Sequence, residues 1–250
     1  MIEIAKYVSE ERAKKLLELH EKKVMLKELL SKQEKPFITE LAGLPRTGKT
    51  HITESVFEFF KNGGIDVKIT GEPAELIKRE YSVSDIRKMT SLDFNDNTLF
   101  YSKKLLQEAV NTNPNLIIMD RGVIDNYFWY QKMLDNGDID ELVYKNRVRR
   151  LRKDLHSIDK LYILTASPEK IIERDINSQI YLEDRKNTTI ENVSKLHRAI
   201  TEMEDNMFEK EHVVNIDTDN LSVIDTSIFI ANDIMDSMHK KLVLINQDNN

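Results

Sequence analysis

Residues 43–50 read Gly-Leu-Pro-Arg-Thr-Gly-Lys-Thr, and this stretch decides the fold. It matches Gly-x4-Gly-Lys-Thr, the phosphate-binding loop known as the Walker A motif. Gly43 and Gly48 let the backbone turn tightly, so that successive N–H groups can surround an anion at the start of a helix. In this motif Lys49 reaches the β- and γ-phosphates of a nucleotide, and the hydroxyl of Thr50 holds Mg²⁺. Further contacts with the nucleotide are expected from Pro45, Arg46, Thr47 and His51.

The flanking sequence supplies the strand and the helix that such a loop requires. Residues 37–42 are largely apolar and predict a buried strand. Residues 50–60 predict an amphipathic helix whose apolar side consists of Ile52, Val56, Phe59 and Phe60. Gly63 and Gly64 end that helix. Strand, loop and helix in this order are typical of a nucleotide-binding loop, and a glycine turn without a ligand is the alternative.

The rest of the chain alternates between apolar strands and helical segments. Further strands are expected at 67–70, 115–119, 161–165 and 212–216. Helices are expected between and after them, at 74–90, 96–112, 124–156, 189–209 and 221–240, with one more beginning at 168. This alternation predicts an α/β protein with a five-stranded parallel sheet and helices on both faces. We expect one domain over residues 36–245, in which a polar segment at 178–188 separates two helices.

Residues 1–35 precede the first strand and predict a helical extension. Ser9 is placed to cap its helix. An isolated helix of this length is marginal in water, so its apolar residues need a surface to pack against. We expect burial of Leu16, Leu17, Met25 and Leu29. That surface belongs either to the domain itself or to another chain, which leaves a partner protein or a homodimer as the alternative.

Composition argues against several classes of protein, including nucleic-acid-binding, membrane-spanning and disulfide-bonded proteins. The chain has 250 residues, a formal net charge of −6 and no cysteine. The negative charge gives no general reason to bind a nucleic-acid polymer, and no apolar run is long enough to span a membrane. Without cysteine there are no disulfides, no cysteine–zinc sites and no thiol nucleophile, which suits a reducing compartment. We therefore expect a cytoplasmic protein that acts on a small-molecule substrate.

Three predicted strands end in residues suited to phosphate chemistry. Gly43, Glu72 and Asp120 each follow an apolar strand, and ligands gather at the carboxyl ends of parallel strands. Asp120 is expected to serve a metal or accept a proton, and Glu72 to act as a base or bind a sugar hydroxyl. Arg121 and Arg46 have guanidinium groups that bind phosphate in a bidentate manner. The alternatives are a helix cap for Asp120, a turn residue for Glu72 and surface ion pairs for the arginines.

From about residue 37 to 240 the chain resembles the thymidylate kinase and deoxynucleoside kinase families of P-loop kinases. The resemblance is carried by the loop with Arg46, by Glu72-Pro73, Asp120-Arg121 and Tyr130-Gln131, by Leu99-Phe100 with Lys104, by Pro168-Glu169 with Arg174, by Glu191 to His197, and by Asp217-Thr218-Asp219. It implies a P-loop NTPase fold with a lid at about 178–188. It also implies adenine contacts near Arg174 and Asp217, and acceptor contacts from Phe100, Lys104, Tyr130 and, in the lid, Arg185.

The chain departs from this family pattern at three places. Pro45 replaces a loop carboxylate of the thymidylate kinases. Gly122 stands where those enzymes have an aromatic residue and nucleoside kinases a serine. Arg185 and Lys186 are the only basic residues between 178 and 188. The resemblance therefore supports the fold and phosphoryl transfer more strongly than it identifies the substrate.

Together these patterns predict an ATP- and Mg²⁺-dependent kinase that transfers the γ-phosphoryl group to a nucleoside or a nucleoside monophosphate. One alternative is a kinase for another small hydroxylated molecule, because the phosphate loop alone does not select an acceptor. Another is a nucleotide-binding ATPase switch that signals through its N-terminal helix.

Overall fold

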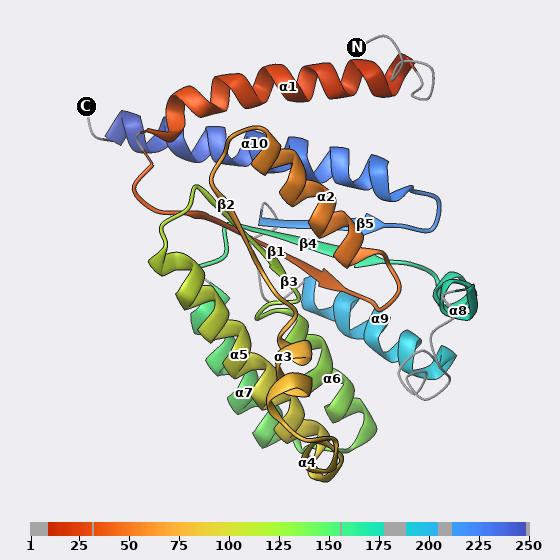
Figure 1. The fold of residues 1–250 in the computed structure, drawn as a ribbon. Helices are drawn as coiled ribbons and strands as arrows, with labels where there is room; N and C mark the ends of the chain where they lie inside the picture. The colour runs from red at the N-terminus through yellow and green to blue at the C-terminus, as the bar shows by residue number, and fades with distance from the viewer. Residues whose placement is uncertain (1–9, 32, 156, 178–188, 205–211, 249–250) are drawn as a thin grey trace.

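A five-stranded parallel sheet forms the centre of the molecule (Figure 1). The computed structural model describes residues 10–31, 33–155, 157–177, 189–204 and 212–248. The strands are β1 (Phe37–Gly43), β2 (Val67–Thr70), β3 (Leu116–Asp120), β4 (Lys160–Thr165) and β5 (Val213–Asp217), in the order β2-β3-β1-β4-β5. This sheet confirms the predicted α/β class. The central strand β1 is buried along its whole length, whereas the edge strands β2 and β5 are partly exposed.

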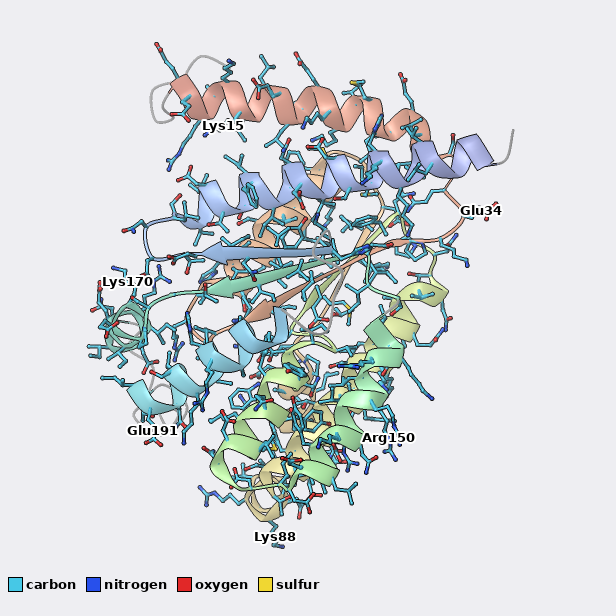
Figure 2. All side chains as sticks on the ribbon, turned by 180° about the vertical axis from the view of Figure 1, so that it is seen from behind. Lys15, Glu34, Lys88, Arg150, Lys170 and Glu191 are labelled. Atoms are coloured by element: carbon cyan, nitrogen blue, oxygen red, sulfur yellow. The ribbon has the colours of Figure 1, made fainter. Side chains whose placement is uncertain are left out.

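Helices cover both faces of the sheet (Figure 1). One face carries α2 (Lys49–Asn62) and α10 (Val223–Asp248), with α1 (Glu10–Leu30) packed outside them. The other face carries α5 (Ser91–Asn111), α6 (Asp125–Asn136), α7 (Glu141–Leu155) and α9 (Ile190–Glu204), with α8 (Pro168–Asn177) beside α9. Two short helices, α3 (Pro73–Glu80) and α4 (Val83–Lys88), extend from β2. Lys15 on α1 and Lys88 on α4 lie at opposite ends of the molecule (Figure 2).

Several predicted helices have different bounds in the structure, and the last, expected at 221–240, runs over Val223–Asp248. The segment expected at 74–90 is divided into α3 and α4, because Tyr81 and Ser82 are extended and the Ser82 side chain caps α4. The next helix begins at Ser91 rather than 96, where Thr90 and Asp93 form a capping box. The segment expected at 124–156 is interrupted at Gly137, whose φ of 75° ends α6. Local capping thus sets bounds that apolar periodicity alone does not reveal.

The N-terminal helix packs on the domain through a different face from the one predicted. Leu19 and Leu26 are buried against α2 and α10, while Leu16, Leu17 and Met25 are 41%, 61% and 61% exposed. The third contact of the buried stripe is Lys23, whose ammonium lies 4.4 Å from the centre of the Phe59 ring. Apolar residues lie on both sides of this helix. The prediction chose the exposed side, because the buried side includes a lysine, which was not expected in a buried position. Leu29 is partly buried, and Ser9 lies outside the described residues.

Ion pairs join the same helix to α10. Arg12 donates two hydrogen bonds to the Asp225 carboxylate, at 2.9 Å and 2.6 Å. Lys22 lies 2.8 Å from the carboxylate of Asp236. In the part of the chain that the structure describes, no helix combines the length and the apolar character that crossing a membrane requires. The segment at 178–188, expected to form a lid, lies outside the described residues.

Candidate active site

The two glycines of the predicted phosphate loop have positive φ values. Gly43 and Gly48 have φ values of 124° and 87°, in the region that favours glycine. A Cβ on Gly43 would lie 2.2 Å from the carbonyl oxygen of Leu164, so no larger residue fits beside β4. The Thr47 hydroxyl donates to the carbonyl of Leu44 at 2.9 Å and holds the loop closed. The loop leads directly into the N-terminus of α2, where the helix dipole favours negative charge.

Lys49 lies buried inside the loop, and no carboxylate among the described residues accepts a hydrogen bond from its ammonium. Its ammonium donates to the carbonyl oxygens of Gly43 (3.0 Å) and Leu44 and to the hydroxyl of Thr47 (3.3 Å). Burial lowers the pKa of Lys49 to about 7; the charge of Arg121 acts in the same direction, and nearby carboxylates oppose it. A bound phosphate would place a negative charge beside this ammonium and would favour its charged form.

Asp120 lies near Thr50, the other residue of the predicted metal site. It ends β3, opposite Leu41 in β1, and is only 6% exposed. Burial raises the pKa of its carboxyl group, while Arg121, Lys49 and a hydrogen bond from Thr50 oppose that shift. Its Oδ1 atom is buried and has no hydrogen-bond partner among the described residues. A carboxylate oxygen without a partner next to a threonine hydroxyl fits a magnesium ion that also binds phosphate oxygens and water.

The described residues contain no group of three or more histidine, cysteine, aspartate or glutamate side chains placed to hold a metal. Magnesium does not require such a cage, because it is usually bound by one or two protein ligands together with substrate phosphates. The predicted metal site therefore needs no protein ligands beyond Thr50 and Asp120 if phosphate oxygens and water complete it.

Arg121 is held between two carboxylates. Its Nε lies 3.1 Å from Oε1 of Glu72, and its Nη1 lies 3.2 Å from Oδ2 of Asp125. Burial opposes the charge of Arg121, but Asp125, Glu72 and Asp120 together outweigh it and raise the pKa of the guanidinium. The backbone of Arg121 has a φ of 56°, and its N–H donates to the carbonyl of Leu41. The chain therefore turns sharply where β3 ends.

Asp125 is a site residue that the sequence analysis missed. The N–H of Gly43 donates to its Oδ1 at 3.4 Å, and the indole N–H of Trp129 donates to its Oδ2 at 3.3 Å. The same carboxylate binds Arg121, so Asp125 connects the phosphate loop, the end of β3 and α6. The four-residue spacing from Arg121 gave no helical signal for this contact, because Arg121 has a φ of 56° and lies before α6 begins at Asp125.

A large cavity opens beside this group, on the side of α3–α6. Its volume is about 680 Å³, and its lining includes Pro45, Arg46, Glu72, Arg121, Asp125, Phe94, Asn95, Asn126 and Trp129. Amide and hydroxyl groups line its floor: Thr98 donates to Oδ1 of Asn126 at 2.9 Å, and Asn95 donates to the carbonyl of Asn126 at 3.1 Å. The cavity therefore offers neutral hydrogen-bonding groups next to Glu72 and Arg121.

Three residues expected in this cavity lie elsewhere. Phe100 is 62% exposed and does not line it. Lys104 lies over the ring of Tyr101, 5.7 Å from the ring centre. Tyr130 is fully buried, and its hydroxyl donates to Oδ1 of Asp96 at 2.6 Å. The side of α5 that carries Phe94 and Asn95 faces the cavity instead. Arg185 lies outside the described residues.

A second, smaller cavity lies between the phosphate loop and the start of α10. Its volume is about 200 Å³, and it is lined by Arg46, Thr47, Gly48, Ile52, Arg174, Thr218, Leu221, Val223 and Thr226. Arg174 donates to the carbonyl of Thr218 at 2.6 Å and to its hydroxyl at 3.0 Å. Asp217 is exposed, and its carboxylate accepts the N–H of Asp219. Thr218, rather than Asp217, therefore faces this cavity.

The remaining loop residues differ in where they point. Arg46 has a φ of 59°, and its Nε donates to Oδ1 of the buried Asp175 on α8 at 2.7 Å. It thus faces α8 while still bordering both cavities. The side chain of His51 is 79% exposed on the outer side of α2, near Glu54. The structure therefore brings together Lys49, Thr50, Asp120, Arg121 and Glu72, and it leaves His51 outside this group.

Comparison with known proteins agrees with the architecture. No protein-family model matches the sequence, and no curated protein matches it. Among solved structures, deoxyadenosine kinase from M. mycoides with bound dATP has a similar fold, with a TM-score of 0.58 at 19% sequence identity. The similarity covers 78% of this chain and 98% of that one. At this identity the similarity establishes the fold, and the chain has the α/β fold of a P-loop kinase.

Proposed function

We propose that the protein is an ATP- and Mg²⁺-dependent kinase that transfers the γ-phosphoryl group to a hydroxyl group of a nucleoside. The observation that carries this proposal is the pairing of Arg121 with both Glu72 and Asp125, at 3.1 Å and 3.2 Å. A monophosphate acceptor carries about two negative charges at neutral pH and needs cations that can bind it. A nucleoside is neutral and needs a base and hydrogen-bonding groups instead.

The other cationic side chains that line the large cavity also support a neutral acceptor. Arg46 is paired with Asp175 at 2.7 Å, and Lys78 with Glu75 at 2.8 Å. Burial lowers the pKa of Lys132, and the charge of Lys195 adds to that effect. The charges of the arginines and of Lys78 are thus already compensated by carboxylates. A phosphate group entering here would compete with the carboxylates that the two arginines bind, whereas a neutral hydroxyl would not.

The residues of the site divide the chemistry between them. Lys49 stabilises charge on the phosphoryl group in transit, at the position that the phosphate loop defines. Thr50 and Asp120 would hold Mg²⁺, which supplies charge neutralisation on the phosphates when bound. Glu72 accepts the proton of the acceptor hydroxyl; burial raises the pKa of its carboxyl group, against the effect of Arg121, and so makes it a stronger base. Arg121 orients Glu72.

The neighbouring fold suggests where to begin the test. Deoxyadenosine is the first acceptor to try, followed by the other nucleosides and their monophosphates, each with ATP–Mg²⁺ and with release of ADP as the measurement. We expect ADP to form with a nucleoside and to require it. Turnover only with monophosphates would contradict the nucleoside assignment. ADP release that is independent of any acceptor would favour the ATPase switch instead.

A further inference from the structure

A glutamate lies in the middle of the central strand. Glu40 is paired with Met119 on one side and Leu161 on the other, and its exposed fraction is 0%. Its neighbours on the same face, Ile38 and Ala42, belong to the apolar core. No lysine or arginine among the described residues forms an ion pair with it. Burial raises the pKa of Glu40 to about 8, and the charge of Asp125 adds to that effect. A buried carboxyl group of this kind is costly unless it is hydrogen-bonded.

Three backbone N–H groups satisfy this carboxyl group. Oε1 of Glu40 accepts from Gly122 at 3.0 Å, from Ile124 at 2.9 Å and from Asp125 at 3.2 Å. These N–H groups lie at the start of α6, where Ile124 occupies the N-cap position and has no side chain able to cap the helix. Glu40 therefore caps α6 from a different element of secondary structure.

The same contact explains why position 122 is a glycine. A Cβ at this position would lie 2.7 Å from Oε2 of Glu40 and 2.6 Å from Cε of Met119. Both distances are shorter than non-bonded contacts allow, so a larger residue would force the Glu40 and Met119 side chains and the turn apart. The glycine that departs from the family pattern thus fits the close approach of Glu40.

The turn that Glu40 binds carries the groups that face the acceptor. Residues 121–125 begin with Arg121 and end with Asp125, and both line the large cavity. We propose that Glu40 is a positioning residue of the acceptor site, whose carboxyl group fixes this turn and thereby the orientation of Arg121 and Asp125. The inference rests on the proposed function only in assigning the turn to an acceptor site; the contacts themselves do not depend on it.

The fluorescence of a tryptophan next to this turn can report on its position. Trp129 is the only tryptophan, and its indole donates to Asp125. Three variants test the contact: Glu40→Leu removes the acceptor atoms, Glu40→Gln keeps one oxygen that can accept the three N–H groups, and Gly122→Ala inserts a methyl group between turn and carboxyl group. Thr39→Val is the matched control, because Thr39 is equally buried in β1 and bonds to Lys160 instead.

We expect Glu40→Leu and Gly122→Ala to increase acrylamide quenching of Trp129 about two-fold or more in proteins with native far-UV circular dichroism, because a released turn exposes the indole. Glu40→Gln and Thr39→Val should quench as the parent does. Unchanged quenching in folded Glu40→Leu would overturn the proposal. If Glu40→Leu does not fold, Gly122→Ala decides, and unchanged quenching there would overturn it as well.

Kinetics separate positioning from a general effect on stability. With deoxyadenosine as the probe, we expect Glu40→Leu to raise the acceptor KM roughly ten-fold while the KM for ATP stays within about two-fold. In an Arg121→Ala background, Glu40→Leu should raise the acceptor KM by much less than ten-fold, because only its effect through Asp125 remains. Equal changes in both KM values, or full additivity, would contradict positioning. If the parent phosphorylates no nucleoside, the proposed function fails, and the fluorescence result still decides the role of Glu40.

Discussion

The two halves of the site hold their cations in opposite ways. Lys49, on the proposed nucleotide side, donates within the described residues to two backbone carbonyls and one hydroxyl, and burial lowers its pKa to about 7. Arg121, on the acceptor side, lies between two carboxylates. The nucleotide side therefore gains most from the arrival of phosphate charge, whereas the acceptor side is already neutralised. This difference supports the proposal of a triphosphate on one side and a neutral acceptor on the other.

The largest expected effect comes from removing the ammonium of Lys49. Lys49→Ala should lower kcat by roughly 100-fold or more, because its charge acts on the phosphoryl group in the transition state. Single-turnover assays with saturating ATP and deoxyadenosine measure this effect. Lys61→Ala is the control on the same helix, because Lys61 is exposed and should leave turnover unchanged. If Lys49→Ala turned over nearly as fast as the parent, the phosphate loop would not take part in the reaction.

The second effect tests the acceptor side of the comparison. Glu72→Gln removes the proposed base and should lower kcat about 100-fold for a nucleoside acceptor, with a smaller loss for Arg121→Ala. If the acceptor is a monophosphate, Arg121→Ala should impair its use more than Glu72→Gln does. Initial rates over a range of acceptor concentrations distinguish the two outcomes. Glu108→Gln, on the exposed side of α5, is the control for loss of a surface carboxylate.

A third effect concerns α1, which packs on the nucleotide-side face without reaching the chemistry. Leu26 is 1% exposed and Leu17 is 61% exposed on the same helix. Leu26→Ala should lower the free energy of unfolding by about 2–4 kcal/mol, and Leu17→Ala by less than about 0.5 kcal/mol. Urea denaturation measures both values. Equal losses would mean that the exposed face of α1 is covered in solution, as a second subunit would cover it.

The smallest effect is a pH dependence that arises on the acceptor side. The pKa of Glu40 is raised from 4.5 to about 8 in the folded protein. Its contribution to stability is complete below pH 4.5 and is lost as the pH rises through about 8, because the unfolded chain releases this proton more easily. Between pH 6 and 8 the parent should lose about 2 kcal/mol relative to Glu40→Gln. Urea denaturation of both proteins at each pH tests the difference, and parallel pH profiles would contradict it.

The sequence by itself determined the nucleotide side. The eight residues of the phosphate loop are contiguous, and their function depends on backbone geometry that glycine positions reveal. The alternation of apolar strands and helices likewise predicted the five-stranded sheet, and it placed β3 within one residue of its observed bounds. Burial of a strand and the start of a helix are local properties, so composition over a few residues indicates them.

Only the tertiary structure decided the acceptor side. Glu40 interrupts an apolar strand and gives no sign that three N–H groups more than eighty residues away will satisfy it. Thr218 faces the smaller cavity in place of Asp217, and the buried face of α1 includes a lysine. Each of these depends on which side chains meet when strands pair and helices pack. A buried polar residue is stable only with partners that the fold supplies, and those partners are distant in the sequence.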